Sequence, residues 1–204
     1  MLNKENNSHL FISSFGETEL TNDDRVGLKL TGLNTKRDLD IAENENIEKA
    51  EALLLEELLS DEIILDYLWL KNLHKLLFGD VWEWAGTLRK RVTNIGVPPS
   101  DILPNLKVLC EKTRTQFEHS TYSHIEIIVR FHHELLKIHP FPNGNGRWAR
   151  TACMRLANIK DLKIDWNPLS EPEYKGEYIK ALQLADRNYG YDKLLLVLQP
   201  LFQI

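Results

Sequence analysis

The residues best suited to do chemistry lie in segment 139–150, which reads HPFPNGNGRWAR. One imidazole, His139, comes first; two glycines, Gly144 and Gly146, follow it; two guanidinium groups, Arg147 and Arg150, come last. Glycines let backbone N–H groups approach a ligand closely, and the N–H groups at a helix start form a natural anion site. The segment therefore predicts an anion-binding loop beside an imidazole.

The spacing of the two arginines indicates what the anion is. Arg147 and Arg150 are three positions apart, so they lie on nearly the same face of a helix. Positive side chains are unfavourable near a helix N-terminus, and we expect a negative ligand to offset them. A polyphosphate fits, because guanidinium groups bind phosphate oxygens bidentately. An imidazole beside phosphates can take the proton of a hydroxyl that attacks phosphorus, a reaction usually assisted by magnesium.

Helical periodicity predicts the elements that position these groups. One helix is expected to deliver His139 at its C-terminal end, and another to begin just after Gly144. Segment 87–97 carries β-branched and basic residues between glycines, which favours a short hairpin or extended flap. The fold class is therefore all-α with one small β element. The expected helices span about 40–58, 61–78, 102–118, 124–138, 145–158, 172–186 and 191–198.

Composition restricts the partners and the compartment. The chain has 204 residues and a net charge of −5, so no broad basic field is present to bind nucleic acid. It has no run of about 20 apolar residues, so we expect no membrane span. Cys110 and Cys153 both lie inside apolar helical patterns, which predicts buried core thiols in a reducing, cytoplasmic compartment.

Two other interpretations of the same residues are weak. The neighbours His132 and His133 point to different faces of a helix and lack the spacing of a zinc-protease site. The glycines at 144 and 146 imitate a dinucleotide-binding fingerprint, but an amphipathic helix precedes them where that motif requires a strand. Neither a histidine metal site nor a dinucleotide fold is expected.

Segment 139–150 resembles the Fic motif, His-Pro-Phe-x-acidic-Gly-Asn-Gly-Arg-x-x-Arg. The corner at 82–86, WEWAG, also looks like Fic proteins. The branch called mobile mystery protein B is especially similar, through FGDVWEWAG at 78–86, NIGV at 94–97 and RFHH at 130–133. The resemblance covers about 46–198. It implies a Fic-type helical bundle with a short β-hairpin flap.

The resemblance also implies a division of the chain and an activity. Residues 1–40 would be a partly extended N-terminal arm, 41–60 an N-terminal helix with a regulatory role, and 61–204 the Fic catalytic domain. The activity would be protein adenylylation, in which AMP passes from ATP to a Ser, Thr or Tyr hydroxyl of a target protein. Mg2+ or Mn2+ would assist. The mobile mystery branch further implies a regulatory partner protein.

Family roles carry over to individual positions of this chain. His139 would be the catalytic base, and Phe141 would anchor the loop in the core. The flap would hold the target segment by strand-like pairing through Thr93, Asn94, Ile95 and Gly96. The side chain of Ile95 would act as an apolar clamp. Gly144, Asn145 and Gly146 would form an anion hole for the phosphates. Arg147 would bind on the β-phosphate side, and Arg150 would bind the γ-phosphate.

Two positions depart from the family pattern. Asn143 stands where the family usually has the acid that helps to hold magnesium, and a neutral amide oxygen is a weaker ligand for a hard cation. Many Fic proteins also carry an inhibitory helix with a glutamate that blocks the second motif arginine, here Arg150. Glu43 could supply this glutamate, although Leu39 occupies the Ser/Thr position of that motif. Alternatively, Glu43 is simply an acid favoured at a helix start.

Two rival functions remain open at this stage. The related Doc proteins transfer a phosphate and have lysine at the position of Gly146, so glycine there favours adenylylation. The second rival is a nucleotide-binding regulatory module with little catalysis, and Asn143 is the reason to consider it.

Overall fold

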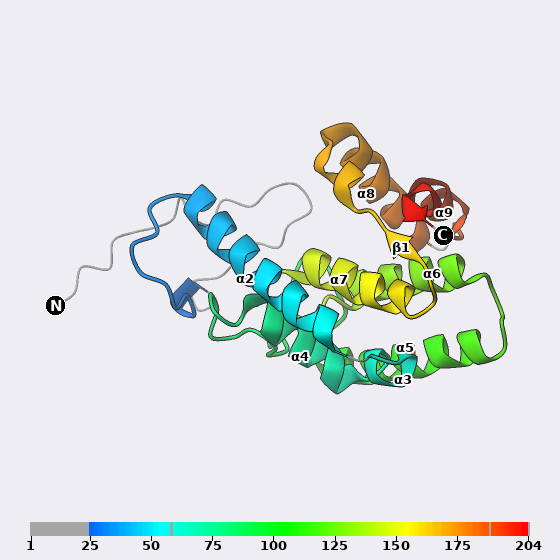
Figure 1. Cartoon of the computed structure of the whole chain (residues 1–204), viewed down its shortest axis with the longest axis horizontal. Helices are drawn as coiled ribbons and strands as arrows, with labels where there is room; N and C mark the ends of the chain where they lie inside the picture. The colour runs from blue at the N-terminus through cyan, green and yellow to red at the C-terminus, as the bar shows by residue number, and fades with distance from the viewer. Residues whose placement is uncertain (1–24, 58, 188, 204) are drawn as a thin grey trace.

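The computed structural model describes residues 25–57, 59–187 and 189–203, which fold mainly into helices (Figure 1). The α-helices are α2 (Lys36–Glu56), α3 (Asp61–Ile64), α4 (Tyr67–Phe78), α5 (Pro99–Glu118), α6 (His124–Ile138), α7 (Asn145–Asn158), α8 (Pro172–Asp186) and α9 (Asp192–Leu198). Two 3-10 helices and two short strands complete them: η2 (Asn167–Ser170), η3 (Gln199–Leu201), β1 (Lys163–Ile164) and β2 (Phe202–Gln203). The predicted all-α class is confirmed.

Polar side chains fix where several helices begin. The Thr35 hydroxyl accepts the N–H of Asp38 at 3.1 Å, and the Asp38 carboxylate accepts the N–H of Thr35 at 2.8 Å. Ser60 and Ser123 cap α3 and α6 through their hydroxyls. Each cap satisfies N–H groups that a helix start leaves open. The reciprocal cap at Thr35 starts α2 a few residues earlier than the apolar periodicity from about residue 40 indicated.

The single helix expected over 61–78 is divided in two. α3 ends at Ile64, and Asp66 starts α4 by accepting the N–H of Leu68 at 2.5 Å. A short acidic side chain competes for backbone N–H groups and therefore favours a cap over a helix interior. The apolar periodicity hides this break, because Ile64, Leu65 and Leu70 are buried on both sides of it.

α7 lies at the centre of the helical core. It packs against α6, α4 and α3, and Figure 1 shows it beside α6 and across from α2. Trp148 of α7 is fully buried, and its indole N–H donates to the carbonyl of Leu70 on α4 at 2.8 Å. The two cysteines, Cys110 and Cys153, are buried and free, as the sequence predicted. A close-packed core therefore supports the first turns of α7.

The chain ahead of α2 pairs with the Trp82 corner. The N–H of Lys29 donates to the carbonyl of Val81 at 2.9 Å, and the N–H of Glu83 donates to the carbonyl of Gly27 at 2.8 Å. These bonds form an isolated antiparallel bridge centred on Trp82. The pairing anchors the chain where it turns into α2.

α2 lies along α4 (Figure 1). Asn46 joins α2 to the end of α4, since its amide donates to the carbonyl of Leu76 at 3.1 Å and accepts the N–H of Asp80 at 2.9 Å. At the other end, Arg155 of α7 donates to the carbonyl of Leu54. Polar contacts at separate points thus fix the register of α2 over the core.

Segment 87–97 is non-helical, as predicted, but no strand forms in it. Its backbone instead follows the end of α6. The N–H of Arg89 donates to the carbonyl of Pro140 at 2.9 Å, and the N–H of Val97 donates to the carbonyl of Ile138 at 3.4 Å. These bonds tie both ends of the flap to the neighbouring loop. Within the described residues, the one named sheet lies elsewhere, where β1 pairs antiparallel with β2.

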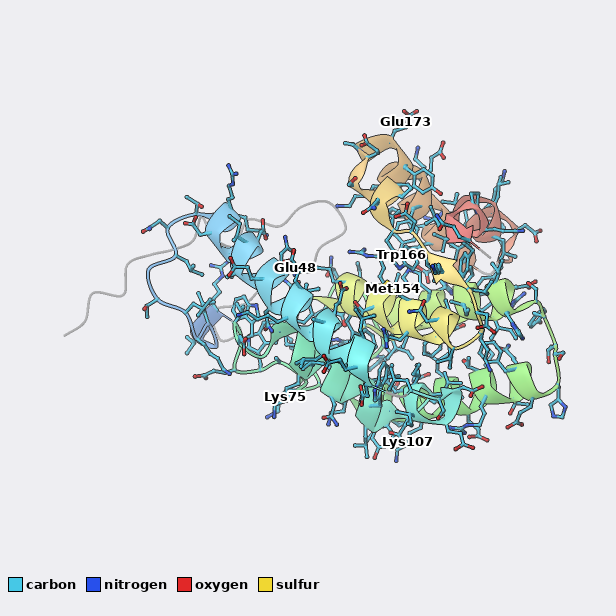
Figure 2. All side chains as sticks on the ribbon, in the orientation of Figure 1. Glu48, Lys75, Lys107, Met154, Trp166 and Glu173 are labelled. Carbon is cyan, nitrogen blue, oxygen red and sulfur yellow. The ribbon has the colours of Figure 1, made fainter. Side chains whose placement is uncertain are left out.

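α8 and α9 form a separate layer that covers one side of α6 (Figure 1). Side chains cover the bundle throughout, as Figure 2 shows. Among the described residues, no helix is both long enough and apolar enough to span a bilayer.

Candidate active site

His139 occupies the C-cap of α6 in a left-handed backbone conformation, with φ 52° and ψ 62°. Its side chain is nearly buried, at 6% exposure. Burial, and secondly the positive charge of Arg89, lowers the pKa of His139 from 6.5 to about 4. The imidazole is therefore neutral at pH 7 and has a lone pair with which to accept a proton.

The loop after His139 is held in the core by an aromatic anchor. Phe141 is fully buried. Its ring stacks on that of His74, with 3.7 Å between the ring centres, and meets the ring of Trp148 edge-on, with 5.0 Å between the centres. The Asn145 side chain bridges the backbone of Phe141, accepting its N–H at 3.0 Å and donating to its carbonyl at 2.9 Å. Asn145 therefore uses its side chain to shape the loop, which leaves its backbone N–H to face a ligand.

His74 supports the loop from α4, and the sequence analysis missed it. Its Nδ1 accepts the N–H of Gly86 at 3.0 Å, so Nε2 carries the proton that bonds to the Asn143 carbonyl at 3.0 Å. Burial lowers the pKa of His74 to about 3, which keeps this tautomer neutral. A signal existed, because His74 shares the apolar face of α4 with Leu70 and Leu77.

The two glycines of the loop have different physical roles. Gly144 has φ 77°, and a Cβ there would lie 2.8 Å from the ring of Phe78. A Cβ at Gly146 would make only an ordinary contact with the Arg150 side chain, at 3.7 Å. Packing thus requires Gly144, whereas Gly146 is partly exposed at an accessible surface in front of α7.

The N-terminus of α7 presents backbone donors toward that accessible surface. Gly144 occupies the N-cap, and no side chain caps this end. The first helical bond runs from the Trp148 N–H to the Gly144 carbonyl at 3.0 Å. The N–H groups of Asn145, Gly146 and Arg147 come before this bond, so they are the donors that an anion would meet.

The two arginines lie on the same side of α7, yet their surroundings differ. Arg147 is partly exposed and lies over the ring of Phe78, 4.9 Å from its centre. Arg150 is half-buried, and burial lowers its pKa, with a further lowering from Arg147 and an opposite effect from Tyr178. A polyphosphate here would meet one accessible and one recessed guanidinium group.

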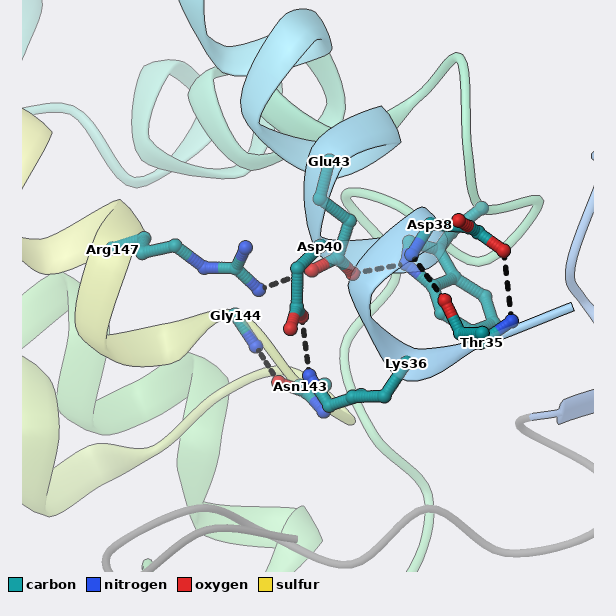
Figure 3. Close-up of polar contacts among 9 residues, drawn as sticks. Thr35, Lys36, Asp38, Asp40, Glu43, Asn143, Gly144 and Arg147 are labelled. Carbon is teal, nitrogen blue, oxygen red and sulfur yellow. Dashed lines mark hydrogen bonds and ion pairs between the residues drawn. The ribbon is translucent and has the colours of Figure 1, made fainter. Parts of the chain in front are cut away.

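Glu43 pairs with the first of these arginines. Its Oε2 lies 2.7 Å from Nη2 of Arg147, and its Oε1 accepts the indole N–H of Trp82 at 2.7 Å. Figure 3 shows Glu43 reaching from α2 toward Arg147 at the start of α7. The family resemblance implied that this glutamate would block Arg150, whereas in the structure its ion pair is with Arg147. The carboxylate is buried, at 4% exposure, so it is no ordinary solvated acid at a helix start.

Asn143 is the residue that was expected to help hold a metal. Its side-chain oxygen accepts the N–H of Gly144, the next residue (Figure 3). Within the described part of the chain, no three His, Cys, Asp or Glu side chains cluster in a way that would hold a metal ion. The loop therefore offers a hard cation one neutral oxygen, which already accepts a hydrogen bond.

The expected target-binding residues lie on the flap beside His139. Asn94, Ile95 and Gly96 are exposed, and Thr93 is partly exposed with its hydroxyl bonded to the Ile95 carbonyl. Gly96 packs closely, since a Cβ there would lie 2.7 Å from the Cβ of His139. The flap and the imidazole thus share one face of the molecule.

The histidine pair ahead of the loop holds the C-terminal helices. His132 bonds to the Tyr178 hydroxyl at 2.7 Å through Nε2. His133 bonds to Asp186 at 3.0 Å through Nε2 and to the Tyr191 hydroxyl at 2.9 Å through Nδ1. Both imidazoles are committed to packing α6 against α8 and the start of α9.

Comparison with known proteins identifies the domain. The model of the Fic/DOC family matches residues 64–157. The chain carries a Fic/DOC domain. This match includes all of segment 139–150 and the flap, and it confirms the expected family. Placement in the mobile mystery protein B branch stays a prediction.

Relatives of the Fic/DOC domain come from sequence and from structure. Protein adenylyltransferase VbhT of Bartonella schoenbuchensis is 30% identical over 124 residues, which cover 56% of this chain and 25% of VbhT. A structure of BepC from Bartonella tribocorum with bound AMPPNP has a TM-score of 0.69 at 20% identity and covers 84% of this chain and 90% of that chain. The Fic domain of Bep8 from Bartonella sp. 1-1C has a TM-score of 0.71 at 22% identity, covering 86% and 89%.

These likenesses differ in what they establish. The structural neighbours share the Fic fold, which confirms the expected helical architecture. The chain spans about a quarter of the length of VbhT, the curated relative that it matches.

Proposed function

We propose that this protein is a Fic-type protein adenylyltransferase that transfers AMP from ATP to a hydroxyl side chain of a target protein. The observation that carries the proposal is the position of His139, a buried neutral imidazole next to an uncapped helix N-terminus with two arginines. The similarity to a protein adenylyltransferase supports AMP, and not a single phosphate, as the group that is transferred.

In this mechanism, His139 takes the proton of the target hydroxyl. Its Nδ1 is buried, which leaves Nε2 as the ring nitrogen that a substrate can reach. The hydroxyl oxygen forms a bond to the α-phosphorus, and the bond from that phosphorus to the bridging β-phosphate oxygen breaks. Pyrophosphate leaves, and the target carries AMP. A neutral base is required, and the lowered pKa of His139 keeps it neutral at physiological pH.

The start of α7 would stabilise the negative charge of the phosphates. The backbone N–H groups of Asn145 and Gly146, together with Gly144, would surround the transferred phosphoryl group. Arg147 would hold the β-phosphate side and Arg150 the γ-phosphate, because both guanidinium groups lie on the same helix face. Gly146 is partly exposed at this end of α7, where the nucleotide would lie.

The loop provides only a weak metal ligand. Mg2+ or Mn2+, when bound, would neutralise phosphate charge, and Asn143 would contribute its side-chain oxygen. That oxygen already accepts the Gly144 N–H, so most of the coordination would come from phosphates and water. We expect a low affinity for the free ion and therefore metal that arrives with ATP.

The flap would present the target hydroxyl. Thr93, Asn94 and Gly96 would offer backbone groups for strand-like pairing, and exposed Ile95 would clamp an apolar side chain. Because Gly96 contacts His139, a segment held along the flap would lie near the imidazole. The partner would be a protein with a Ser, Thr or Tyr side chain in an extended segment.

Glu43 would regulate the same site. Its carboxylate occupies Arg147, the group proposed to bind the β-phosphate side, so nucleotide and glutamate would compete. We propose that α2, which spans Lys36–Glu56 and so begins before the expected segment 41–60, is the regulatory helix. The catalytic domain of a cytoplasmic protein would be 61–204, and the N-terminal arm, expected over 1–40, would end before α2. Residues 1–24 of that arm lie outside the described residues. A partner protein that displaced α2 would activate the enzyme.

Label transfer from ATP tests the activity. Lysate would be incubated with α-labelled or γ-labelled ATP and Mg2+ or Mn2+, using the wild type, His139→Ala and Glu43→Gly. We expect protein labelled by the α-label alone, lost in His139→Ala and stronger in Glu43→Gly. Labelling from the γ-label alone would instead indicate phosphate transfer of the Doc type. No labelling in any variant would contradict transferase activity and favour a nucleotide-binding module.

A further inference from the structure

The flap contains a buried cation with an unusual set of partners. Arg89 is 3% exposed. Its Nε donates to the carbonyl of His139 at 2.6 Å, its Nη1 to that of Arg91 at 2.8 Å, and its Nη2 to those of Ile138, at 3.3 Å, and Val97. All four acceptors are backbone carbonyl oxygens, and the acceptors belong to two different segments.

Two of these acceptors lie at the negative end of α6. The helix ends at Ile138, and His139 is its C-cap. The last carbonyls of a helix lack intrahelical partners and carry partial negative charge, which favours a cation there. A buried guanidinium is costly unless its donors are satisfied, and this helix end satisfies Arg89 without a carboxylate.

The same contacts hold the backbone of His139 in a conformation that is uncommon for a residue other than glycine. His139 has φ 52°. Such a conformation persists when the surroundings determine it fully. The Arg89 side chain binds the carbonyl of His139, and the Arg89 N–H binds the carbonyl of Pro140 at 2.9 Å. Arg89 thus binds the backbone carbonyls of both His139 and Pro140.

The other two acceptors fix the flap. The carbonyls of Arg91 and Val97 lie near the two ends of the exposed stretch that was proposed to hold the target. Gly96 shows how tightly this assembly is packed: a Cβ there would lie 2.4 Å from Nη2 of Arg89 and 2.7 Å from the Cβ of His139. One guanidinium group therefore connects the flap to the end of α6.

We propose that Arg89 is a positioning residue that sets the placement of the His139 imidazole relative to a target segment held by the flap. The inference rests on the proposed transferase function. Arg89 touches neither nucleotide nor reacting hydroxyl in this proposal. It acts by fixing two backbone segments that each carry part of the site.

The charge of Arg89 leaves a measurable signature on His139. Burial is the first cause of the lowered pKa of His139, and the charge of Arg89 is the second. A backbone hydrogen bond involving Leu136 acts in the opposite direction. Removing the charge should raise the pKa of His139, while burial keeps it below 6.5.

Two variants separate geometry from charge. Arg89→Lys keeps the positive charge but loses the fork that reaches several carbonyls at once. Arg89→Gln removes the charge and keeps an amide donor. Lys90→Gln, at the exposed neighbouring position, is the matched control for loss of a positive charge. For each protein, NMR of labelled histidine follows the titration of His139, and steady-state label transfer gives kcat and the KM for ATP.

We expect the pKa of His139 to rise in Arg89→Gln and to stay near its wild-type value of about 4 in Arg89→Lys and Lys90→Gln. Misplacing a reacting group by about 1 Å can reduce the rate about 100-fold, so we expect kcat to fall about 10- to 100-fold in both Arg89 variants. The KM for ATP should change little, because the phosphate-binding residues lie on α7.

Two outcomes would overturn the proposal. In the first, the pKa of His139 in Arg89→Gln equals that of the wild type, and Arg89→Gln transfers label as fast as the control Lys90→Gln. The other is a loss that appears only in the KM for ATP. If Arg89→Gln does not fold, the kcat of the conservative Arg89→Lys decides. If the wild type transfers no label, the transferase function fails, but the titration still tests whether Arg89 controls His139.

Discussion

An ion pair links α2 to α7: Oε2 of Glu43 lies 2.7 Å from Nη2 of Arg147. The indole N–H of Trp82 donates to the other carboxylate oxygen at 2.7 Å, and this hydrogen bond fixes the orientation of the carboxylate. Charged groups are seldom buried unless they are paired, and Glu43 has both an ion pair and a hydrogen bond. α2 therefore places a negative group where the proposed function needs a phosphate.

Removing this carboxylate should activate the enzyme. In Glu43→Ala, Arg147 loses its competitor while the helical residue at 43 keeps a good propensity. We expect nucleotide affinity and label transfer to rise about tenfold, which corresponds to about 1.4 kcal/mol. Calorimetric titration with a non-hydrolysable ATP analogue and label transfer measure the two effects. Glu45→Ala, an exposed acid on the same helix, is the control, and an equal effect of both variants would rule out direct competition.

Loss of the indole N–H should produce a weaker activation through the same acid. Trp82→Phe keeps a buried ring but removes the donor that fixes Oε1 of Glu43. We expect a few-fold rise in transfer, smaller than in Glu43→Ala. In the double variant the two effects should not add, because both act on one interaction. Additive effects in this cycle of label-transfer rates would show that Trp82 acts independently of Glu43.

Restoring an acid at position 143 should change the metal dependence. Asn143→Asp supplies a carboxylate in place of a neutral oxygen, and hard cations prefer carboxylates. We expect the Mg2+ concentration for half-maximal transfer to fall severalfold in Asn143→Asp and to stay equal or rise in Asn143→Ala. Titration of Mg2+ at fixed ATP makes the comparison. Identical Mg2+ curves for all three proteins would place the metal away from residue 143.

Stability should fall as the pH drops below neutrality, because buried histidines must stay neutral in the folded state. Burial lowers the pKa to about 3 for His74 and His132 and to about 4 for His139. The unfolded chain, with histidine pKa values near 6.5, binds more protons between these values, so protonation favours unfolding. Each of these histidines should contribute a slope of up to about 1.4 kcal/mol per pH unit in the free energy of unfolding.

Urea unfolding between pH 7 and pH 5 measures this slope. His74→Phe removes one of the three groups, so its slope should be smaller, although the variant should be less stable at pH 7. The stability loss should be about 1–3 kcal/mol, because the carbonyl of Asn143 and the N–H of Gly86 lose their partner. His119→Gln replaces an exposed imidazole as a control. A slope reduced as much in His119→Gln as in His74→Phe would contradict the assignment.

Much of the fold could be predicted from the sequence, because helical periodicity is local. The helices α6, α7 and α8 have the expected bounds, and the loop that was expected to bind an anion lies between α6 and α7. The division at Asp66 was missed, since a cap inside an apolar pattern changes the backbone without changing the pattern. The β1–β2 pairing was missed as well, because two-residue strands carry no alternation to detect.

The sequence by itself determined the chemistry of the loop, because His139, the glycines and the arginines are neighbours along the chain. Only the tertiary structure decided what surrounds it. Glu43 meets Arg147 and not Arg150 because contacts such as those of Asn46 fix the register of α2 over α4, and thereby the place of Glu43 beside α7. Arg89 and His74 reach the loop from distant segments. Such contacts depend on how helices pack, so local spacing could place His74 on the buried face of α4 but could not show which backbone atoms it meets.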